Sequence, residues 1–293
     1  MDISQIIQFT FSGLTLGSIY ALMAVSLSIV YKVSRVISFA QGEFFVFGAL
    51  TMITLTGIGV WAPLAFALSV LMAALLGSII EQALIRPVLK TTLGTVITMT
   101  IAISLALRGL ALLLWGRGSH TSATFSSGEP IRILDAALQI QVLWIVGVTG
   151  AALLLIWLFF EKTMLGIAIR ASADNPVGAS LVGISIRKVN LLAWSWGSGL
   201  GAVAGMVVAP LYFLQYGSGV LPMVNGFIAI AISGLKSIPA AVVAGFFLGF
   251  VEAYSIGFVS SQFSEVIVFT VLIVVLQIRS KAASGAGFDE KGM

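Results

Sequence analysis

The chain has 293 residues, of which 59% are hydrophobic and 9% are charged, and its formal net charge is +4. Soluble domains carry about 25% charged residues, so this composition excludes an ordinary water-soluble enzyme domain. Cysteine is absent and His120 is the single histidine, which excludes disulfides and thiolate sites and predicts no metal or other cofactor. The basic residues are scattered singly instead of forming a stripe, so nucleic-acid binding is not expected.

Hydropathy and charge together predict an all-α membrane protein, a bundle of about eight transmembrane helices of which one or two are interrupted. A helix needs about 20 apolar residues to cross the bilayer, because lipid offers no partner for backbone N–H and C=O groups. The first helix should remain as a span, since no basic region precedes it and no small-residue cleavage site ends it. In chain order the predicted helices cover residues 6–31, 36–57, 61–85, 95–115, 141–160, 189–214, an interrupted segment 225–257, and 262–278.

The distribution of lysine and arginine predicts the orientation, because positively charged loops are retained on the cytoplasmic side. Only Arg117 and Arg132 fall on the opposite side. The N-terminus should therefore lie outside and the C-terminus inside a bacterial inner membrane that the chain crosses several times. The cytoplasmic set consists of Lys32, Arg35, Arg86, Lys90, Lys162, Arg170, Arg187, Lys188, Arg279, Lys281 and Lys291.

One arginine and the C-terminal tail need separate explanations. Arg108 lies within a predicted span, about two turns before Trp115, so its side chain is expected to reach along the helix toward the membrane interface. Residues 1–281 are expected to form one transmembrane domain. Residues 282–293 are small and polar and cannot bury a core, so they should form a disordered cytoplasmic tail.

Glycines at four-residue spacing predict how the helices pack. Helices in lipid gain little from hiding leucine against leucine, and they associate where small residues let two backbones approach. Positions i and i+4 share a helix face, so each such series predicts one close contact. The series are Gly13 and Gly17; Gly197, Gly201 and Gly205, continued by Ala209; and Ala241, Gly245 and Gly249.

Two places break the apolar pattern within predicted spans, and both are candidates for a solute path. The first break covers residues 38–43, and the second, residues 233–239, splits the segment 225–257. Transporters often place discontinuous helices where freed backbone groups contact a polar solute. The candidate path residues are Phe39, Gln41, Gly42, Glu43, Gly234, Lys236 and Pro239.

Charged residues at these breaks also have simpler interpretations. Glu43 would then lie at the cytoplasmic end of its helix and pair with Lys32 or Arg35. Lys236 would pair with Glu252, line a wet cavity, or reach the cytoplasmic surface. The sequence leaves these alternatives open.

Two further acids have positional explanations. Glu81 is close to Arg86 near a cytoplasmic helix end, and Glu265 begins the last helix. Neither is assigned a role.

The longest cytoplasmic loop, residues 161–188, contains the signals of a short helix. Asn175 suits an N-cap, Pro176 the first helical position, and Gly183 the residue just beyond the end. Val177 and Leu181 share one face of it. Such a short helix is not stable alone in water, so it must dock on the protein's own helices, on lipid headgroups or on a cytoplasmic partner.

Four stretches in the same order resemble the permeases of branched-chain amino acid ABC importers, in particular their smaller permease subunit. Residues 13–50 resemble the N-terminal signature, in which a Gly-rich helix leads to an Asn-Phe-Ala-His-Gly-acid motif, and residues 86–87 resemble an Arg-Pro that follows the third helix. Residues 170–189 resemble the stretch that docks on the ATP-binding subunit, and residues 232–253 resemble the Gly-rich C-terminal signature. The resemblance covers nearly the whole chain.

The resemblance implies that residues 1–281 are the permease domain of an ATP-driven importer for branched-chain or other hydrophobic or neutral amino acids. It implies a second permease subunit, two cytoplasmic ATP-binding subunits and an external solute-binding protein as partners. The chain has no G-x-x-x-x-G-K-[ST] loop, so ATP hydrolysis is expected on another chain and this chain is not expected to be an enzyme. The residues implied to couple to the ATPase are Arg170, Asn175, Pro176, Ala179 and Gly183.

Departures from the family pattern leave the solute open. Ser38 and Gln41 stand where the family usually has Asn and His, and Val177 replaces a common acid. Ser233, Lys236 and Ala240 stand where glycines are usual, and glycine would allow a closer backbone approach. The alternative function is an ion-coupled secondary transporter or a channel for a small polar solute such as urea or an amide, for which Glu43 and Glu252 are the available intramembrane acids.

Overall fold

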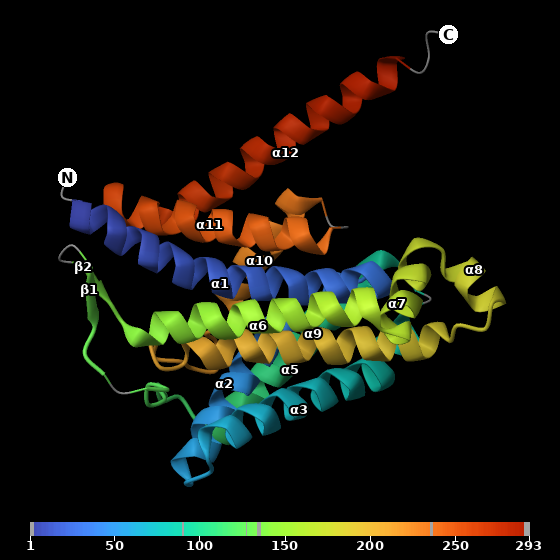
Figure 1. Cartoon of the computed structure of the whole chain (residues 1–293). Coiled ribbons are helices and arrows are strands. Elements are labelled where there is room, and N and C mark those ends of the chain that lie inside the picture. Colours follow the sequence, from blue (N-terminus) through green and yellow to red (C-terminus); the bar gives the residue numbers. More distant parts are fainter. Residues whose placement is uncertain (1–2, 90, 127, 134–135, 235–236, 290–293) are drawn as a thin grey trace.

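The computed structural model describes residues 3–89, 91–126, 128–133, 136–234 and 237–289. These residues form a helical bundle with one small antiparallel hairpin, which confirms the predicted all-α fold class (Figure 1). The elements are α1 (Ile3–Ser34), α2 (Gln41–Gly57), α3 (Ala62–Ile80), the π-helix η1 (Glu81–Ile85), α4 (Arg86–Val88), α5 (Leu93–Trp115), β1 (Ile131–Ile133), β2 (Ala136–Leu138), α6 (Ile140–Lys162), α7 (Met164–Asp174), α8 (Pro176–Leu181), α9 (Ile186–Val208), α10 (Val220–Ser233), α11 (Ile238–Phe258) and α12 (Ser264–Asp289).

Six helical spans within the described chain are long and apolar enough to cross a membrane. They are α1, α5, α6, α9, α11 and the continuous run Ala62–Val88, which comprises α3, η1 and α4. The apolar helices Val220–Ser233 and Ser264–Ile278 are shorter. Together with α2, these helices occupy the eight predicted segments, and the segment 225–257 is interrupted as predicted. The chain is therefore a multi-pass membrane protein.

Two predicted helix boundaries are wrong. The predicted helix 36–57 begins only at Gln41: residues 36–38 belong to no helix or strand, and residues 39–40 form a turn. The predicted helix 189–214 ends at Val208, shortly before Pro210, whose missing N–H cannot continue the helical hydrogen-bond pattern. Hydropathy does not reveal either end, since both irregular segments are largely apolar.

The C-terminal helix runs past the predicted domain boundary. Helix α12 continues through residue 281 to Asp289, and residues 290–293 lie outside the described chain. The division of the chain at residue 281 stays a prediction. Figure 1 shows α12 leaving the bundle at a steep angle beyond its contacts with α10 and α11.

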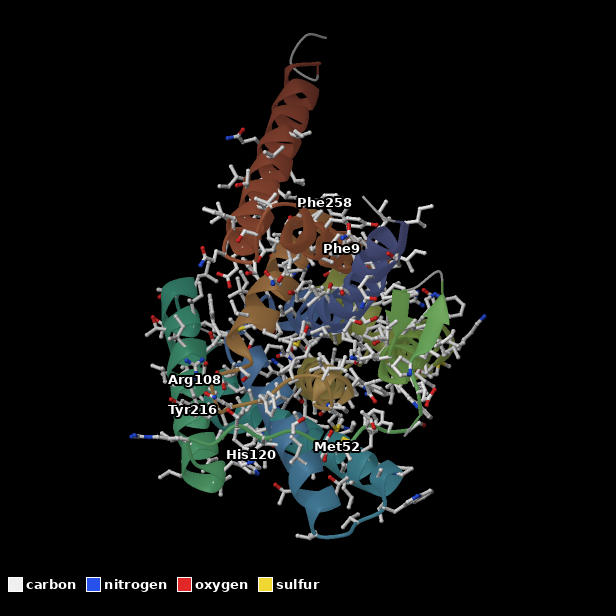
Figure 2. All side chains as sticks on the ribbon, turned by 90° about the vertical axis from the view of Figure 1, so that its left-hand side faces the viewer. Phe9, Met52, Arg108, His120, Tyr216 and Phe258 are labelled. Atoms are coloured by element: carbon white, nitrogen blue, oxygen red, sulfur yellow. The ribbon has the colours of Figure 1, made fainter. Side chains whose placement is uncertain are left out.

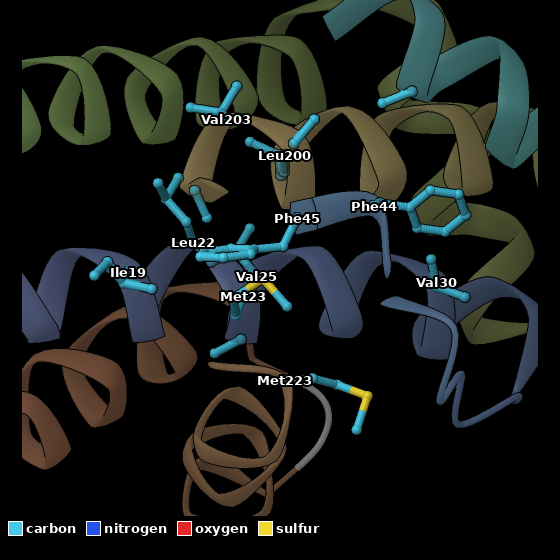
Figure 3. Packing of buried hydrophobic residues seen from close by; sticks show 14 of the residues in the cluster. Ile19, Leu22, Met23, Val25, Val30, Phe44, Phe45, Leu200, Val203 and Met223 are labelled. Atoms are coloured by element: carbon cyan, nitrogen blue, oxygen red, sulfur yellow. The ribbon is translucent and has the colours of Figure 1, made fainter. Parts of the chain in front are cut away.

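Helices α1 and α9 lie at the centre of the bundle and are largely buried, whereas α3, α5 and α6 expose most of their apolar surface. Buried side chains of α1, α2 and α9, including Leu22, Phe45 and Leu200, gather in one cluster (Figure 3). Exposed leucines on the outer helices fit a lipid environment, where burial against a neighbouring helix gains little.

Small residues make the closest helix crossings, as the four-residue spacing predicted. A Cβ atom added to Gly17 of α1 would lie 2.9 Å from the Cα atom of Phe246 of α11, and one added to Gly245 would lie 2.5 Å from the Cα atom of Ala21. On α9, Gly205 lies directly against the carbonyl of Phe45. These contacts are with backbone atoms, so a larger side chain cannot be accommodated by a rotamer change.

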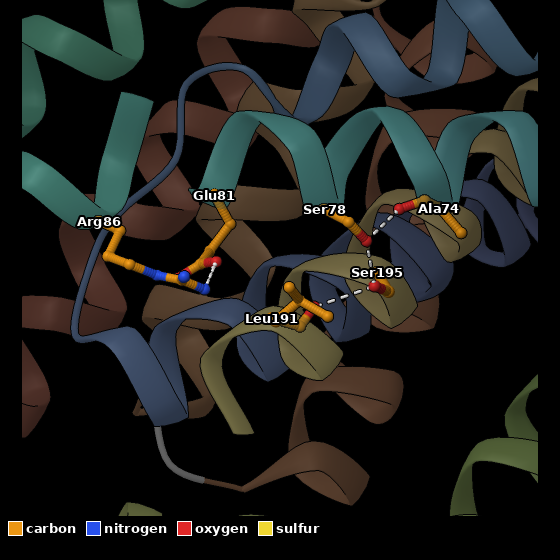
Figure 4. A network of polar contacts seen from close by, with 6 residues as sticks. All are labelled: Ala74, Ser78, Glu81, Arg86, Leu191 and Ser195. Carbon is orange, nitrogen blue, oxygen red and sulfur yellow. Dashed lines mark hydrogen bonds and ion pairs between the residues drawn. The ribbon is translucent and has the colours of Figure 1, made fainter. Parts of the chain in front are cut away.

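The π-turn after α3 places an acid and an arginine on one face. Glu81 is fully buried and accepts from Arg86 Nη2 at 2.5 Å and from Arg86 Nε at 3.2 Å, which confirms the predicted pairing (Figure 4). The hydroxyls of Ser78 and Ser195 lie 2.5 Å apart and join α3 to α9. A π-turn brings residues five apart together, so this short irregularity satisfies the buried carboxylate.

The two ends of the bundle carry different elements. The α8 end carries α7 and α8, and the hairpin end carries β1 and β2 (Figure 1). At the hairpin end Phe9 of α1 packs on Phe258 of α11 with ring centroids 5.7 Å apart (Figure 2). The His120 ring nitrogen Nε2 lies 3.0 Å from the Trp115 carbonyl oxygen, and the His120 backbone pairs with that of Leu214. These contacts give His120 a structural role in joining two loops.

Candidate functional site

The segment between α1 and α2 enters the bundle as irregular backbone. Arg35 ends α1 with a φ of 55°, a left-handed conformation that costs a non-glycine residue about 1–2 kcal/mol. Its guanidinium donates to the carbonyl of Ala173, at the end of α7, at 2.8 Å. Val36, Ser38 and Ala40 are buried. Irregular backbone is tolerated at membrane depth only where protein covers it, and this segment meets that condition.

Helix α2 begins inside the bundle instead of at its α8 end. Gln41 contacts Gly197 and Gly201, which lie near the middle of α9. Its amide donates to the Ser26 hydroxyl, which donates to the Gly197 carbonyl at 2.7 Å. Glu43 thus lies in the first turn of its helix, as one interpretation of the sequence expected, but that turn lies inside the bundle and not at its α8 end.

The start of α2 meets the start of α10. A Cβ atom on Gly42 would lie 2.5 Å from the carbonyl oxygen of Gly219, the residue before α10, and 3.1 Å from Met223 Cβ. Only glycine at both positions allows this approach. Two helix N-termini, each with a partial positive charge, thus converge beside Glu43 in the first turn of α2. We call this place the α2–α10 junction.

Glu43 and Arg108 form a buried ion pair at the junction. Glu43 Oε1 accepts from Arg108 Nη2 at 2.8 Å and from the Ser104 hydroxyl at 2.8 Å, both from α5. The alternative in which Glu43 pairs with Lys32 or Arg35 does not hold, and the prediction that Arg108 simply extends to the interface is wrong. A carboxylate buried in the bundle needs a cation, and α5 supplies one.

Several buried polar atoms at the junction have no hydrogen-bond partner among the described residues. They are Ser38 Oγ, Gln41 Oε1, Glu43 Oε2 and Arg108 Nε. Such atoms are rare in native proteins and each costs about 1–3 kcal/mol. Their concentration at one place marks the junction as polar within an apolar bundle. Phe39, also predicted here, lies at its edge and is partly exposed.

The second break lies at the other end of α10. Gly234 ends α10 with a φ of 85°, and α11 begins after Ser237, whose hydroxyl accepts from the Ala240 N–H at 3.3 Å. Pro239 lines a cavity of about 340 Å³ together with Lys32 of α1 and residues of α6 and α7. Lys236 lies outside the described residues, so its role stays a prediction.

In the described part of the chain, the first break meets the start of α10 and the second follows its last turn, so the two are not brought together. Gly42 instead meets Gly219, and Glu43 meets Arg108, contacts that sequence reasoning did not predict. A lone arginine within a span and a lone acid within another span are the signal that could have linked them, because buried charges need partners.

The short loop helix forms as predicted. The Asn175 side chain accepts from the Gly178 N–H at 2.9 Å, Pro176 opens α8, and Gly183 follows it with a φ of 86°. Ala179 is the residue of α8 that is buried. Arg170 on α7 pairs with Glu161 at 2.6 Å. These residues build and anchor the helix.

The outward face of α8 is apolar. Val177, Leu181 and Val182 are strongly exposed there. Exposed apolar side chains are individually common, but two on the six-residue helix α8 and one directly after it form an apolar surface at one end of the bundle. The described residues contain no group of three or more metal-ligating side chains.

The chain is similar to known transport proteins over nearly its whole length. A family model described as "Branched-chain amino acid transport system / permease component" matches residues 9–276. The high-affinity branched-chain amino acid transport system permease protein LivH of Salmonella typhimurium is 30% identical, with 97% of each chain covered. The corresponding protein BraD of Pseudomonas aeruginosa is 28% identical, with 99% of each covered.

More distant matches were found as well. The ribose import permease protein RbsC of Escherichia coli is 22% identical, over 92% of this chain and 85% of that protein. A solved structure, PsaBC from Streptococcus pneumoniae in complex with Fab, matches 90% of this chain and 89% of that chain at 13% identity with a TM-score of 0.47. That similarity is too low to carry an argument.

Proposed function

Because the chain belongs to the family of permease components of branched-chain amino acid transport systems, we propose that it is the membrane-spanning subunit of an ATP-driven importer of branched-chain or other hydrophobic or neutral amino acids. The observation that carries the proposal is the exposed apolar face of α8 at one end of the bundle. In this proposal the α8 end is cytoplasmic and an ATP-binding subunit covers Val177, Leu181 and Val182. The N-terminus then lies outside and the C-terminus inside a bacterial inner membrane.

The proposed assembly contains two permease subunits, two ATP-binding subunits and an external solute-binding protein. Arg170, Asn175, Pro176, Ala179 and Gly183 keep α8 folded and positioned, while the apolar face makes the contact. The solute path runs through the α2–α10 junction, where buried polar atoms and two helix N-termini meet. ATP hydrolysis takes place on the ATP-binding subunits.

Movement of α8 has a direct physical route to the junction. Helix α8 follows α7, and the last turn of α7 accepts the Arg35 hydrogen bond. Arg35 in turn begins the buried segment that leads to Gln41. A rigid shift of α7 and α8 therefore displaces the segment that carries the start of α2. Closure of the ATP-binding subunits against α8 would in this way open the solute path at the α2–α10 junction.

Reconstitution with the ATP-binding subunits and the solute-binding protein tests the function, and Leu181→Asp tests its central contact. Leu181 is 83% exposed, so the substitution leaves the bundle folded but introduces a charge into the proposed interface. We expect ATP-dependent uptake of leucine by the wild-type assembly and loss of at least about 90% of it in the variant, since a desolvated unpaired charge costs several kcal/mol. Copurification of the ATP-binding subunit should fall in parallel.

Val259→Asp is the matched control, because Val259 is 63% exposed at the other end of the bundle. It should leave copurification of the ATP-binding subunit unchanged. Full uptake by the Leu181→Asp assembly would contradict the role of α8. Uptake by this chain alone, driven by an ion gradient, would instead support the alternative of a secondary transporter.

Arg35 provides a test of the route between α8 and the junction. Arg35→Gly keeps the left-handed backbone without strain but removes the bond to the Ala173 carbonyl. We expect the assembled complex to hydrolyse ATP normally while transporting about 5- to 10-fold less solute per ATP, as lost coupling of 1–1.4 kcal/mol implies. Arg35→Lys, which keeps a donor, should retain more coupling, and equal transport by all three proteins would exclude this route.

A further inference from the structure

A cavity of about 400 Å³ lies on the hairpin side of the α2–α10 junction. Its walls come from α1, α10, α11, the start of α12 and the loop 209–219, and Phe45 of α2 forms part of it. The cavity therefore adjoins the proposed solute path. Of its polar residues, Glu252 was considered from the sequence only as a partner for Lys236 or as the acid of a secondary transporter.

The Glu252 carboxylate lines the cavity and accepts hydrogen bonds through only one of its two oxygens among the described residues. Glu252 Oε2 accepts from the Tyr20 hydroxyl at 2.6 Å and from the Asn225 amide at 3.3 Å. Tyr20 and Asn225 are buried, so they hold the carboxylate in place. The other oxygen, Oε1, accepts no hydrogen bond from the described residues. The hydrogen bond that links α1 to α11 uses Oε2 alone, so Oε1 is available to a ligand.

The charge of the cavity is one-sided. Glu252 and Glu265 both line it, and none of its described lining residues is lysine, arginine or histidine. A pocket with low-dielectric walls and net negative charge concentrates cations. The preferred partner of the free Glu252 oxygen is thus a cationic donor such as a primary ammonium group.

The start of α10 offers an environment for an anion. Ser218, Leu221 and Pro222 line the cavity, so the first turn of α10 and its partial positive charge face it. Leu221 and Asn225 are four residues apart, or about 6 Å along the helix. Asn225, which holds the Glu252 carboxylate, is thus about one helical turn from the start of α10, a spacing that suits an amino acid backbone with its contacts. The rest of the wall is largely apolar, with Ile19 and Ile256 among its members.

We propose that this cavity binds neutral α-amino acids as zwitterions. The ammonium group donates to the free oxygen of Glu252, the carboxylate lies at the first turn of α10, and the apolar side chain packs against Ile19, Phe45 and Ile256. This inference rests on the proposed function and adds the recognition site on the permease itself.

Equilibrium binding to the purified permease–ATPase complex in nanodiscs tests the site. The probes are L-leucine and its 2-hydroxy analogue, in which a hydroxyl replaces the ammonium group. Glu252→Gln keeps an oxygen that accepts from Tyr20 but removes the charge, so leucine affinity should fall about 10- to 100-fold, while binding of the hydroxy analogue, a net anion, should not weaken. Glu129→Gln, an exposed acid outside the cavity, is the control for net charge and should change neither.

Tyr20→Phe separates recognition from a structural tie. It removes the hydrogen bond but leaves the carboxylate. It should therefore lower the Tm of the complex, while leucine affinity falls much less than in Glu252→Gln. Unchanged leucine affinity in Glu252→Gln, or an equal loss for both probes, would overturn the inference. If the wild-type assembly imports leucine with ATP in that case, the proposed function stands; if the wild-type assembly imports no amino acid, both fail.

Discussion

Gly249→Val should prevent α11 from packing on α1 and so abolish recovery of folded protein. A valine Cβ would meet the backbone of Gly17 and would lie 2.9 Å from the Gly13 carbonyl oxygen. No rotamer relieves a clash with backbone, so the two helices must separate. Overpacking in a tight interior costs about 1–3 kcal/mol and sometimes more, and this contact involves the central helix of the bundle. The monodisperse yield after extraction and the Tm measure the effect.

Gly147→Val on α6 is the matched control for the change itself. A Cβ at Gly147 meets nothing within 4 Å, so valine there faces open space. It should change the Tm by no more than a few degrees, in line with a surface substitution of about 0.5 kcal/mol. Normal yield and Tm for Gly249→Val would mean that α1 and α11 do not cross at these glycines.

The sequence predicts helix positions well because hydropathy and small-residue spacing are local properties. The spacing of Gly197, Gly201 and Gly205 is read directly from the chain, and it predicts a contact face without knowledge of the partner helix. The same holds for α8, where the Asn175 cap and the Gly183 terminus are separate local signals. Elements of the proposed functional surface that depend on local sequence signals, such as α8, can therefore be predicted from the sequence.

Junctions between distant segments are not visible in this way. Residues 36–40 are mostly apolar, so hydropathy continues the helix through them, and only packing against α9 shows that α2 starts inside the bundle. Gly219 follows an irregular loop and carries no local signal of its contact with Gly42. The Glu252 cavity likewise needs Tyr20 and Asn225 from two other helices. Tertiary contacts decide these features.

Arg108→Gln should destabilise the protein more than Glu43→Gln, although both break the same ion pair. The side chain of Glu43 is 2% exposed, so loss of Arg108 leaves a carboxylate without a cation inside the bundle. That situation costs about 3–5 kcal/mol. The side chain of Arg108 is 30% exposed and can reach the outside when Glu43 is neutralised, so we expect about 1 kcal/mol for Glu43→Gln.

The double variant decides whether the pair acts as a unit. With both charges removed, the penalty of the uncompensated carboxylate disappears, so Glu43→Gln combined with Arg108→Gln should be more stable than Arg108→Gln alone. The coupling energy from the free energies of unfolding in mixed micelles should be about 2–3 kcal/mol, within the range for contacting residues. Additive effects would show that the two side chains do not interact in the membrane.

Arg170 and Glu161 supply the matched control pair at the α8 end. They lie 2.6 Å apart, but their side chains are 39% and 42% exposed, so water screens their attraction. The same cycle with Arg170→Gln and Glu161→Gln should give a coupling energy below about 1 kcal/mol. If the buried pair couples strongly and the exposed pair does not, Arg108 is fixed to the start of α2. Any movement of that start during transport must then carry α5 with it.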